Sequence, residues 1–179
     1  SSYSVTGVQT CALPIFSYGD DISAGKVLAV ELRARLGDQM DRFIERGGLV
    51  IGICNGFQVL VKMGFLPRPI SPSEQKFSLI NNDCGRFEDR WVYLKPDSRK
   101  CVFVKDDGII ELPVAHGEGK VVAMDFSLID DLYDNGQIVF RYVNADGSDA
   151  EFPANPNGSY LGVAGVCDET GRILGLMPH

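Results

Sequence analysis

The chain has 179 residues, of which 45% are hydrophobic and 23% are charged, and its formal net charge at pH 7 is −7. This length and balance are typical of one globular domain with a substantial core, and no apolar run approaches the length needed to cross a membrane. The negative charge argues against nucleic acid as a partner, because binding phosphates requires clustered lysine and arginine side chains.

The N-terminal stretch is predicted not to be native. Val5–Ile15 resembles the translation of a common sequencing adapter. The same stretch lacks the charged start and the long apolar segment of a signal peptide. We therefore assign residues 1–15 to an adapter-like tail and residues 16–179 to the domain, and we expect the fold to begin after the tail.

The cysteines argue for a reducing compartment. The chain has five, without any C-x-x-C pair. An odd number at wide spacing predicts neither a disulfide framework nor a metal site, and it favours the cytoplasm. Three of them, Cys84, Cys101 and Cys167, are interpreted as ordinary packing residues.

Residues 22–46 are predicted to form a helix that ends at Gly47–Gly48. Gly37 is a point at which this helix would break or kink. The apolar residues that repeat every four positions, and that should face the core, are Leu28, Leu32, Leu36, Met40 and Ile44, with Phe43 widening the stripe.

A cysteine follows the next predicted strand. Leu49–Ile53 is a short apolar run typical of a buried strand, and the spacing of Phe57 and Leu60 predicts a helix from about Asn55. Cys54 then lies at a sharp turn inside G-x-C-x-G, the thiol counterpart of the G-x-S-x-G nucleophile elbow. A helix N-terminus favours the thiolate, which is the nucleophile. The alternative is a small buried cysteine without chemistry.

The remainder of the chain contains several strand-like runs. Asp168–Gly171 is predicted to be a hairpin turn between the last two of them. Helices and strands together predict the α/β class. The predicted strands are Arg90–Leu94, Cys101–Lys105, Gly108–Val114, Gln137–Val143, Val163–Cys167 and Arg172–Met177.

Five ordered motifs carry a family resemblance. Gly52–Gln58 resembles the nucleophile motif of class I glutamine amidotransferases, and its Cys-Asn-Gly-Phe-Gln form is similar to that of the glutaminase subunits of phosphoribosylformylglycinamidine synthase, from purine biosynthesis. The resemblance implies an open, mostly parallel, flavodoxin-like sheet flanked by helices with an antiparallel extension, and it implies that N-terminal strands are missing before Phe16. The other four motifs are Phe16–Asp20, Pro113–Gly119, Asn155–Ser159 and Gly175–His179.

A cysteine nucleophile needs a base, and the chain has two histidines. The family order, Cys then His then Glu, assigns the base to His179. The Pro-Glu pair that follows the histidine in the family would come after the last residue here, so we expect a cut C-terminus. His116, with Glu118 two residues on, is the competing candidate. We expect His116 to lie in a partly exposed loop, where docking a partner or shaping the rim of the site is the favoured role.

The resemblance also implies roles near the elbow. The backbone N–H of Asn55 would donate to an oxyanion, and a second donor would come from a Gly-Gly pair where this chain has Pro14–Ile15. Gln58 would contact bound glutamine, although a solvated helix residue is an equal reading of the sequence. The polar loops Asn82–Phe87 and Asn155–Ser159 are interpreted as partner-facing surface.

The implied activity is hydrolysis of glutamine through a Cys54 thioester. The resemblance implies that ammonia passes to a separate synthetase subunit, which uses ATP and Mg²⁺ to convert formylglycinamide ribonucleotide to the amidine, and that a small accessory subunit is a further candidate partner. No G-x-x-x-x-G-K-[ST] stretch is present, so no cofactor is expected in this chain. Two alternatives stay open: another thiol hydrolase on the same scaffold, and a non-catalytic binding subunit. As written, the chain is expected to be nearly inactive.

Overall fold

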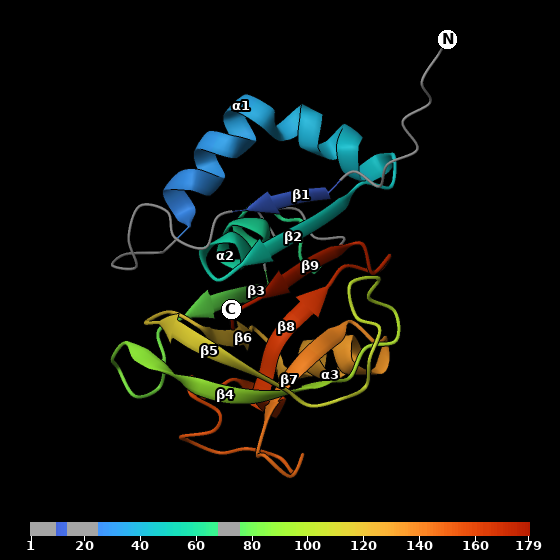
Figure 1. The fold of residues 1–179 in the computed structure, drawn as a ribbon. Coiled ribbons are helices and arrows are strands. Elements are labelled where there is room, and N and C mark those ends of the chain that lie inside the picture. The colour runs from blue at the N-terminus through green and yellow to red at the C-terminus, as the bar shows by residue number, and fades with distance from the viewer. Residues whose placement is uncertain (1–9, 14–24, 68–75) are drawn as a thin grey trace.

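The computed structural model describes residues 10–13, 25–67 and 76–179 (Figure 1). The Phe16–Asp20 motif and Pro14–Ile15 lie outside the described residues. The helices and strands are β1 (Thr10–Leu13), α1 (Lys26–Glu45), β2 (Leu49–Ile53), α2 (Asn55–Lys62), β3 (Phe77–Ile80), β4 (Glu88–Pro96), β5 (Ile110–His116), β6 (Lys120–Ala123), α3 (Phe126–Asp134), β7 (Ile138–Val143), the 3-10 turn η2 (Tyr160–Gly162), β8 (Val163–Cys167) and β9 (Ile173–Leu176). Within these residues, no helix is both long enough and apolar enough to cross a membrane.

The α/β class is confirmed, with a mixed seven-stranded sheet in the order β1-β2-β9-β8-β7-β4-β5. Pairing is parallel from β1 to β9 and antiparallel from β9 to β5. The expectation of a mostly parallel sheet therefore does not hold for the described strands. Parallel neighbours need a long crossover such as α1, whereas a short turn such as Asp168–Gly171 gives an antiparallel pair.

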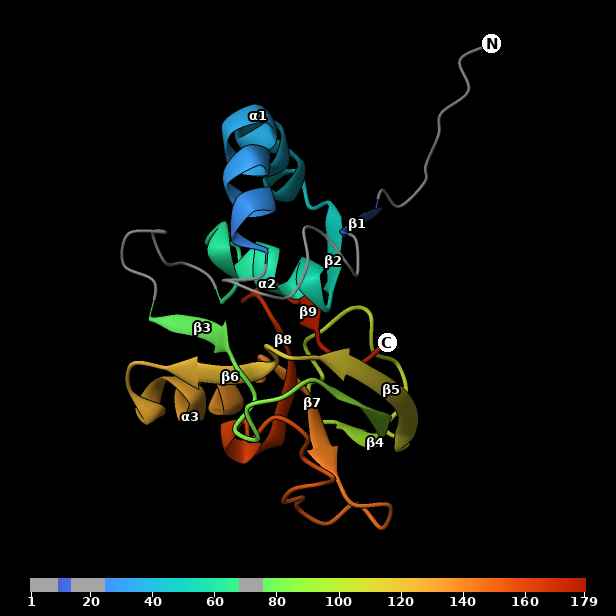
Figure 2. The ribbon, with the colours of Figure 1, turned by 90° about the vertical axis from the view of Figure 1, so that its left-hand side faces the viewer.

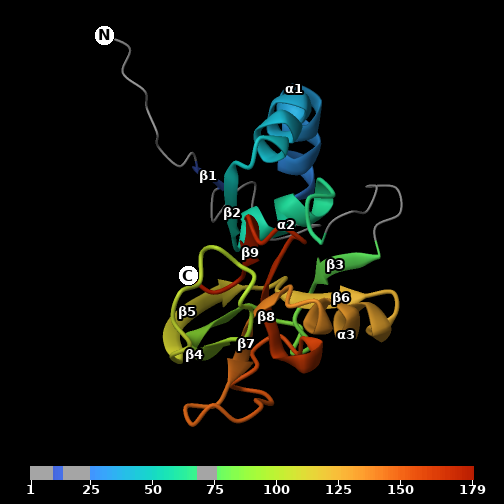
Figure 3. The same cartoon turned by 90° about the vertical axis from the view of Figure 1, so that its right-hand side faces the viewer.

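Two helices cover the parallel part of the sheet. The helix α2 packs against β2 and β9, and α1 packs against α2 (Figures 2 and 3). Most of the predicted stripe of α1 contacts the core, but Leu36 is exposed. Gly37 is buried inside an unbroken helix. The N–H groups of Gly47 and Gly48 close the helix by donating to the carbonyls of Ile44 and Phe43.

Most predicted strands lie within two residues of the observed ones, but Cys101–Lys105 is wrong as a strand. There the hydroxyl of Ser98 accepts the N–H groups of Lys100 and Cys101, so the chain turns instead of extending. Cys101 is nevertheless buried, and so is Cys167, as expected for packing residues. The pattern did not predict α3, β3 or β6, and the last two form a separate two-stranded sheet.

Part of the N-terminal tail joins the sheet. Thr10–Leu13 pair in parallel with Leu49–Gly52 as the edge strand β1. The expectation that the fold begins after residue 15 is therefore wrong for these four residues. The edge of β2 offers unpaired backbone groups, and a short segment without proline can satisfy them. That residues 1–15 are adapter-like remains a prediction.

The sheet curls, so its last strand returns toward its first ones. The edge strand β5 lies near the point where β2 and β9 end, and the C-terminus lies beside β5 (Figure 3). The backbone N–H of His179, after β9, donates to the carbonyl of Pro113 on β5 at 3.0 Å. This closure brings residues from distant parts of the chain around the start of α2.

Candidate active site

The elbow at Cys54 has the strained backbone that the motif predicts. Cys54 lies between β2 and α2 with φ 53° and ψ −109°, a backbone conformation that residues other than glycine rarely adopt. A Cβ on Gly52 would lie 2.5 Å from the carbonyl oxygen of Gly56, so strand and helix approach too closely for any larger residue. An ordinary packing cysteine would need neither feature. The geometry therefore favours a nucleophile over the alternative of a small buried cysteine.

The start of α2 aims backbone donors at the turn. The N–H groups of Phe57 and Gln58 donate to the carbonyl of Cys54, at 3.0 and 3.2 Å. Since helical bonds run back four residues, the N–H of Asn55 has no acceptor within the helix. Its place directly after Cys54 suits a donor to an oxyanion. This role of Asn55 remains a prediction.

His179 follows the strand that neighbours the elbow. β2 and β9 pair in register up to Ile53 and Leu176, and the N–H of Cys54 donates to the carbonyl of Leu176 at 2.7 Å. Cys54 and His179 thus follow the carboxyl ends of adjacent parallel strands, where ligands of such sheets bind. Partial burial lowers the pKa of His179 below that of an ordinary histidine. The lowered pKa favours the neutral imidazole, which is the form able to accept a proton.

The outer edge of β5 contacts both Cys54 and His179. The Sγ of Cys54 lies 3.9 Å from the carbonyl oxygen of Ala115, and the carbonyl of Pro113 binds the backbone of His179. Both carbonyls belong to one edge strand, two residues apart. Proline is suited to an edge strand, because it has no backbone N–H that a second neighbouring strand would have to pair with. The strand β5 thus positions the thiol and the histidine from a single short segment.

His116 is not the partly exposed loop residue that was expected. It ends β5 and is fully buried, and its Nδ1 lies 3.2 Å from Oδ1 of Asn82. Burial lowers the pKa of His116 to about 4. Since Asn82 Oδ1 also accepts the N–H of Gly119, Nδ1 of His116 must carry the proton. This arrangement fits a structural histidine.

The loops Asn82–Phe87 and Asn155–Ser159 are not simply partner-facing surface. The amide of Asn82 donates to the carbonyl of His116 at 2.9 Å, and the amide of Asn157 donates to the carbonyl of Gly119 at 2.8 Å. Asn82 and Asn157 are both buried. Their amides replace strand hydrogen bonds for the segment that follows β5, because buried backbone groups need partners. The pattern did not reveal these residues, since asparagine beside glycine also predicts an ordinary turn.

Gln58 is not a solvated helix residue. Its side chain is buried, and its Nε2 donates to the carbonyl of Glu118 at 2.7 Å. Its Oε1 accepts from Nδ2 of Asn55 at 3.0 Å. In this structure Gln58 connects α2 to the segment after β5. Contact with glutamine remains a prediction.

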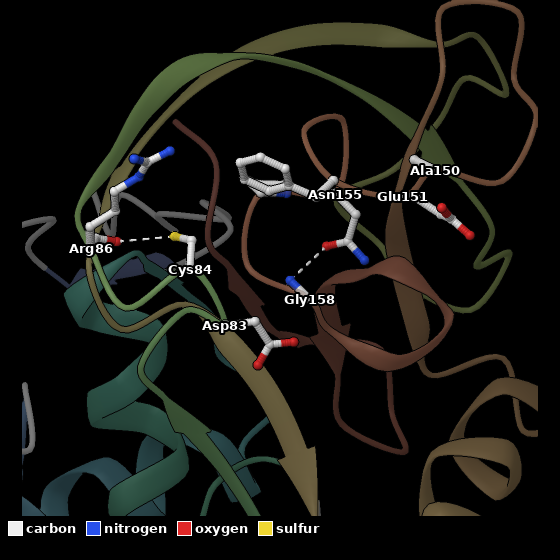
Figure 4. Close-up of a pocket in the computed structure, with 9 residues that line it drawn as sticks. Asp83, Cys84, Arg86, Ala150, Glu151, Asn155 and Gly158 are labelled. Atoms are coloured by element: carbon white, nitrogen blue, oxygen red, sulfur yellow. Dashed lines mark hydrogen bonds between the residues drawn. The ribbon is translucent and has the colours of Figure 1, made fainter.

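A cavity of about 630 Å³ opens between the two polar loops (Figure 4). Its charged lining residues are Asp83, Arg86 and Glu151, and Cys84 lies beside Arg86. The predicted site residues do not line it. Within the described residues, Cys54, Cys84, Cys101 and Cys167 form no disulfide.

The sequence is similar to a known protein family. Residues 4–179 match the CobB/CobQ-like glutamine amidotransferase domain. Phosphoribosylformylglycinamidine synthase subunit PurQ of Dehalococcoides mccartyi is 49% identical over 92% of this chain and 63% of its own length. The subunit PurQ of Methanococcus maripaludis is 43% identical over 92% of this chain and 61% of its own length. The chain thus spans about three fifths of the length of these curated relatives.

Solved structures agree in fold. A chain of the PurLQS structure from Thermotoga maritima has a TM-score of 0.69 and 35% identity, over 96% of this chain and 68% of that one. A glutamine amidotransferase from the same organism has a TM-score of 0.53 and 16% identity, over 96% of this chain and 55% of that one. At this lower identity the likeness concerns the fold alone.

Proposed function

Because the chain belongs to the family of CobB/CobQ-like glutamine amidotransferase domains, we propose that it is the glutaminase part of a phosphoribosylformylglycinamidine synthase. The observation that carries the proposal is the strained elbow at Cys54, with His179 following the adjacent parallel strand. A structural cysteine would require neither. The identities with PurQ subunits support the choice of this synthase.

In the proposed mechanism, the Cys54 thiolate attacks the side-chain carboxamide of glutamine. The carbonyl oxygen becomes an oxyanion, which the N–H of Asn55 stabilises. His179 takes the thiol proton and gives it to the departing ammonia, which leaves a glutamyl thioester on Cys54. Water then attacks the thioester while His179 accepts a proton from it. Glutamate leaves, and the thiol is restored.

The ammonia is proposed to pass to a synthetase subunit. That subunit would bind ATP and Mg²⁺ and would convert formylglycinamide ribonucleotide to the amidine, and this chain would hold no cofactor. The similarity to a chain of the PurLQS structure supports an assembly of this kind, with a small third subunit as a further partner. The cytoplasm is the proposed location.

The test is replacement of Cys54 by alanine, measured as glutamate released from glutamine in the presence of the synthetase subunit. Loss of the nucleophile should lower turnover by about 10⁴-fold or more. Amination supported by added ammonium salt should survive, because it does not use the thiol. Cys84→Ala is the control, since Cys84 lies outside the elbow. Turnover of glutamine by the Cys54→Ala protein at the wild-type rate would overturn the assignment.

A further inference from the structure

One face of the β4–β5 pair exposes an aromatic side chain beside the site. Trp91, on β4, is 66% exposed. Its cross-strand partner is Pro113, whose carbonyl holds the backbone of His179. The exposure of Trp91 is unusual, because a tryptophan on a sheet normally packs against neighbours or finds a partner.

The apolar character extends toward one end of the strand. Side chains alternate between the two faces of a strand, so Phe87, directly before β4, should share the face of Trp91. Phe87 is 53% exposed, while Glu88 and Val92 are buried on the opposite face. An exposed pair of large aromatic residues next to a catalytic elbow is a mark of an interaction surface.

The charges around Trp91 are acidic. By the strand register, Asp89 and Glu111 lie on the same face as Trp91, Asp89 next along β4 and Glu111 diagonally across on β5. Both are exposed. The first basic residue on this face of β4, Lys95, lies beyond Tyr93, farther from Pro113. A partner should therefore present an apolar pocket for Trp91 with basic residues at its rim.

We propose that the face formed by Phe87, Asp89, Trp91, Glu111 and Pro113 is where the synthetase subunit docks, with Trp91 as the central anchor. The inference rests on the proposed function. Ammonia released at Cys54 must enter the synthetase without escaping to water, so the partner has to cover the surface next to His179. Trp91 lies one strand from the carbonyl that binds His179. Tryptophan is among the residues that most often dominate the binding energy of interfaces.

The composition of the chain offers a direct probe, because Trp91 is its single tryptophan. The chain is labelled with 5-fluorotryptophan and mixed with the unlabelled synthetase subunit. Its one fluorine resonance should shift and should lose its sensitivity to a paramagnetic agent dissolved in the solvent. A resonance that stays equally accessible in the assembled complex would overturn the proposal.

The matched pair of variants is Trp91→Ala and Phe126→Ala. Phe126 is also 66% exposed, but it begins α3, away from β4 and β5. Trp91→Ala should raise the Kd for the synthetase subunit by about tenfold or more. Phe126→Ala should leave it unchanged. Both variants remove exposed side chains, and both should fold.

The outcomes separate this inference from the proposed function. If the wild-type pair makes product from glutamine, and Trp91→Ala binds as tightly as wild type, the docking face is wrong and the function stands. If the Cys54→Ala protein makes product from glutamine at the wild-type rate, the function itself is wrong, whatever the binding of Trp91→Ala. Weaker binding of Phe126→Ala alone would place the interface on α3 and would also overturn the inference.

Discussion

At the scale of single residues, the elbow depends on a missing side chain. A Cβ at position 52 would meet the carbonyl of Gly56, which belongs to the backbone and cannot move aside. Gly52→Ala should therefore lower the free energy of unfolding by about 1–3 kcal/mol. It should also reduce glutamine turnover, because Cys54 would be displaced. Chemical denaturation measures the first effect. Gly108→Ala is the control, since nothing lies within 4 Å of a Cβ there.

His116 predicts a dependence of stability on pH. Its pKa is about 4 in the folded chain and about 6.5 in the unfolded one, mainly because of burial. The unfolded state therefore binds more protons between these values, and the stability present above pH 6.5 is lost as the pH falls toward 4. Between pH 7 and pH 5 this contribution should fall by about 2 kcal/mol.

The measurement is urea denaturation of wild type and His116→Gln at the two pH values. The wild type should lose about 2 kcal/mol more than the variant, since glutamine does not titrate. Carboxylates and His179 titrate in both proteins, so their contributions cancel. An equal loss in both proteins would contradict the prediction.

At the scale of elements, one asparagine holds the end of β5 in place. Asn82 donates to the carbonyl of His116 and accepts a hydrogen bond from the N–H of Gly119. His116 and Gly119 are both buried. Asn82→Ala leaves these groups without partners, which should cost about 2 kcal/mol or more. The amide of Gly119 should then exchange faster with deuterium. Asn135→Ala, at the exposed end of α3, should change neither quantity, and equal behaviour of the two variants would refute the role.

The elements that could be predicted from sequence are those with local signals. Leu49–Ile53, Cys54 and the start of α2 are adjacent in the sequence. The Asp168–Gly171 turn likewise lies between β8 and β9, the two strands that it connects. The pairing of Asn82 with His116 joins residues 34 positions apart, and no local pattern encodes it. The strands β3 and β6 have four residues each, too few for their alternation to stand out. Cys101–Lys105 is an apolar run like that of a buried strand, but the hydroxyl of Ser98, which binds the N–H groups of Lys100 and Cys101, turns the chain just before it.

At the scale of the whole molecule, protection should differ between the sheets. Every residue of β8 is buried, and β8 has a neighbour on each side. By contrast, among the strands that the structure describes, β3 and β6 pair only with each other. In native-state hydrogen exchange, the amides of β8 should open only with global unfolding, whereas β6 should open at lower free energy. Equal protection of Val121 and Ala164 would show that the small sheet unfolds together with the large one.

The closure of the sheet has a consequence for how the protein is made. The elbow leaves the ribosome early, but β5, which contacts Cys54, and β9, which leads to His179, are synthesised much later. Contacts between such distant segments form late in folding, because a long loop must close first. The nascent thiol therefore waits without β5 beside it and without its histidine. Under the proposed function, a nascent chain that still lacks these segments would therefore not turn over glutamine.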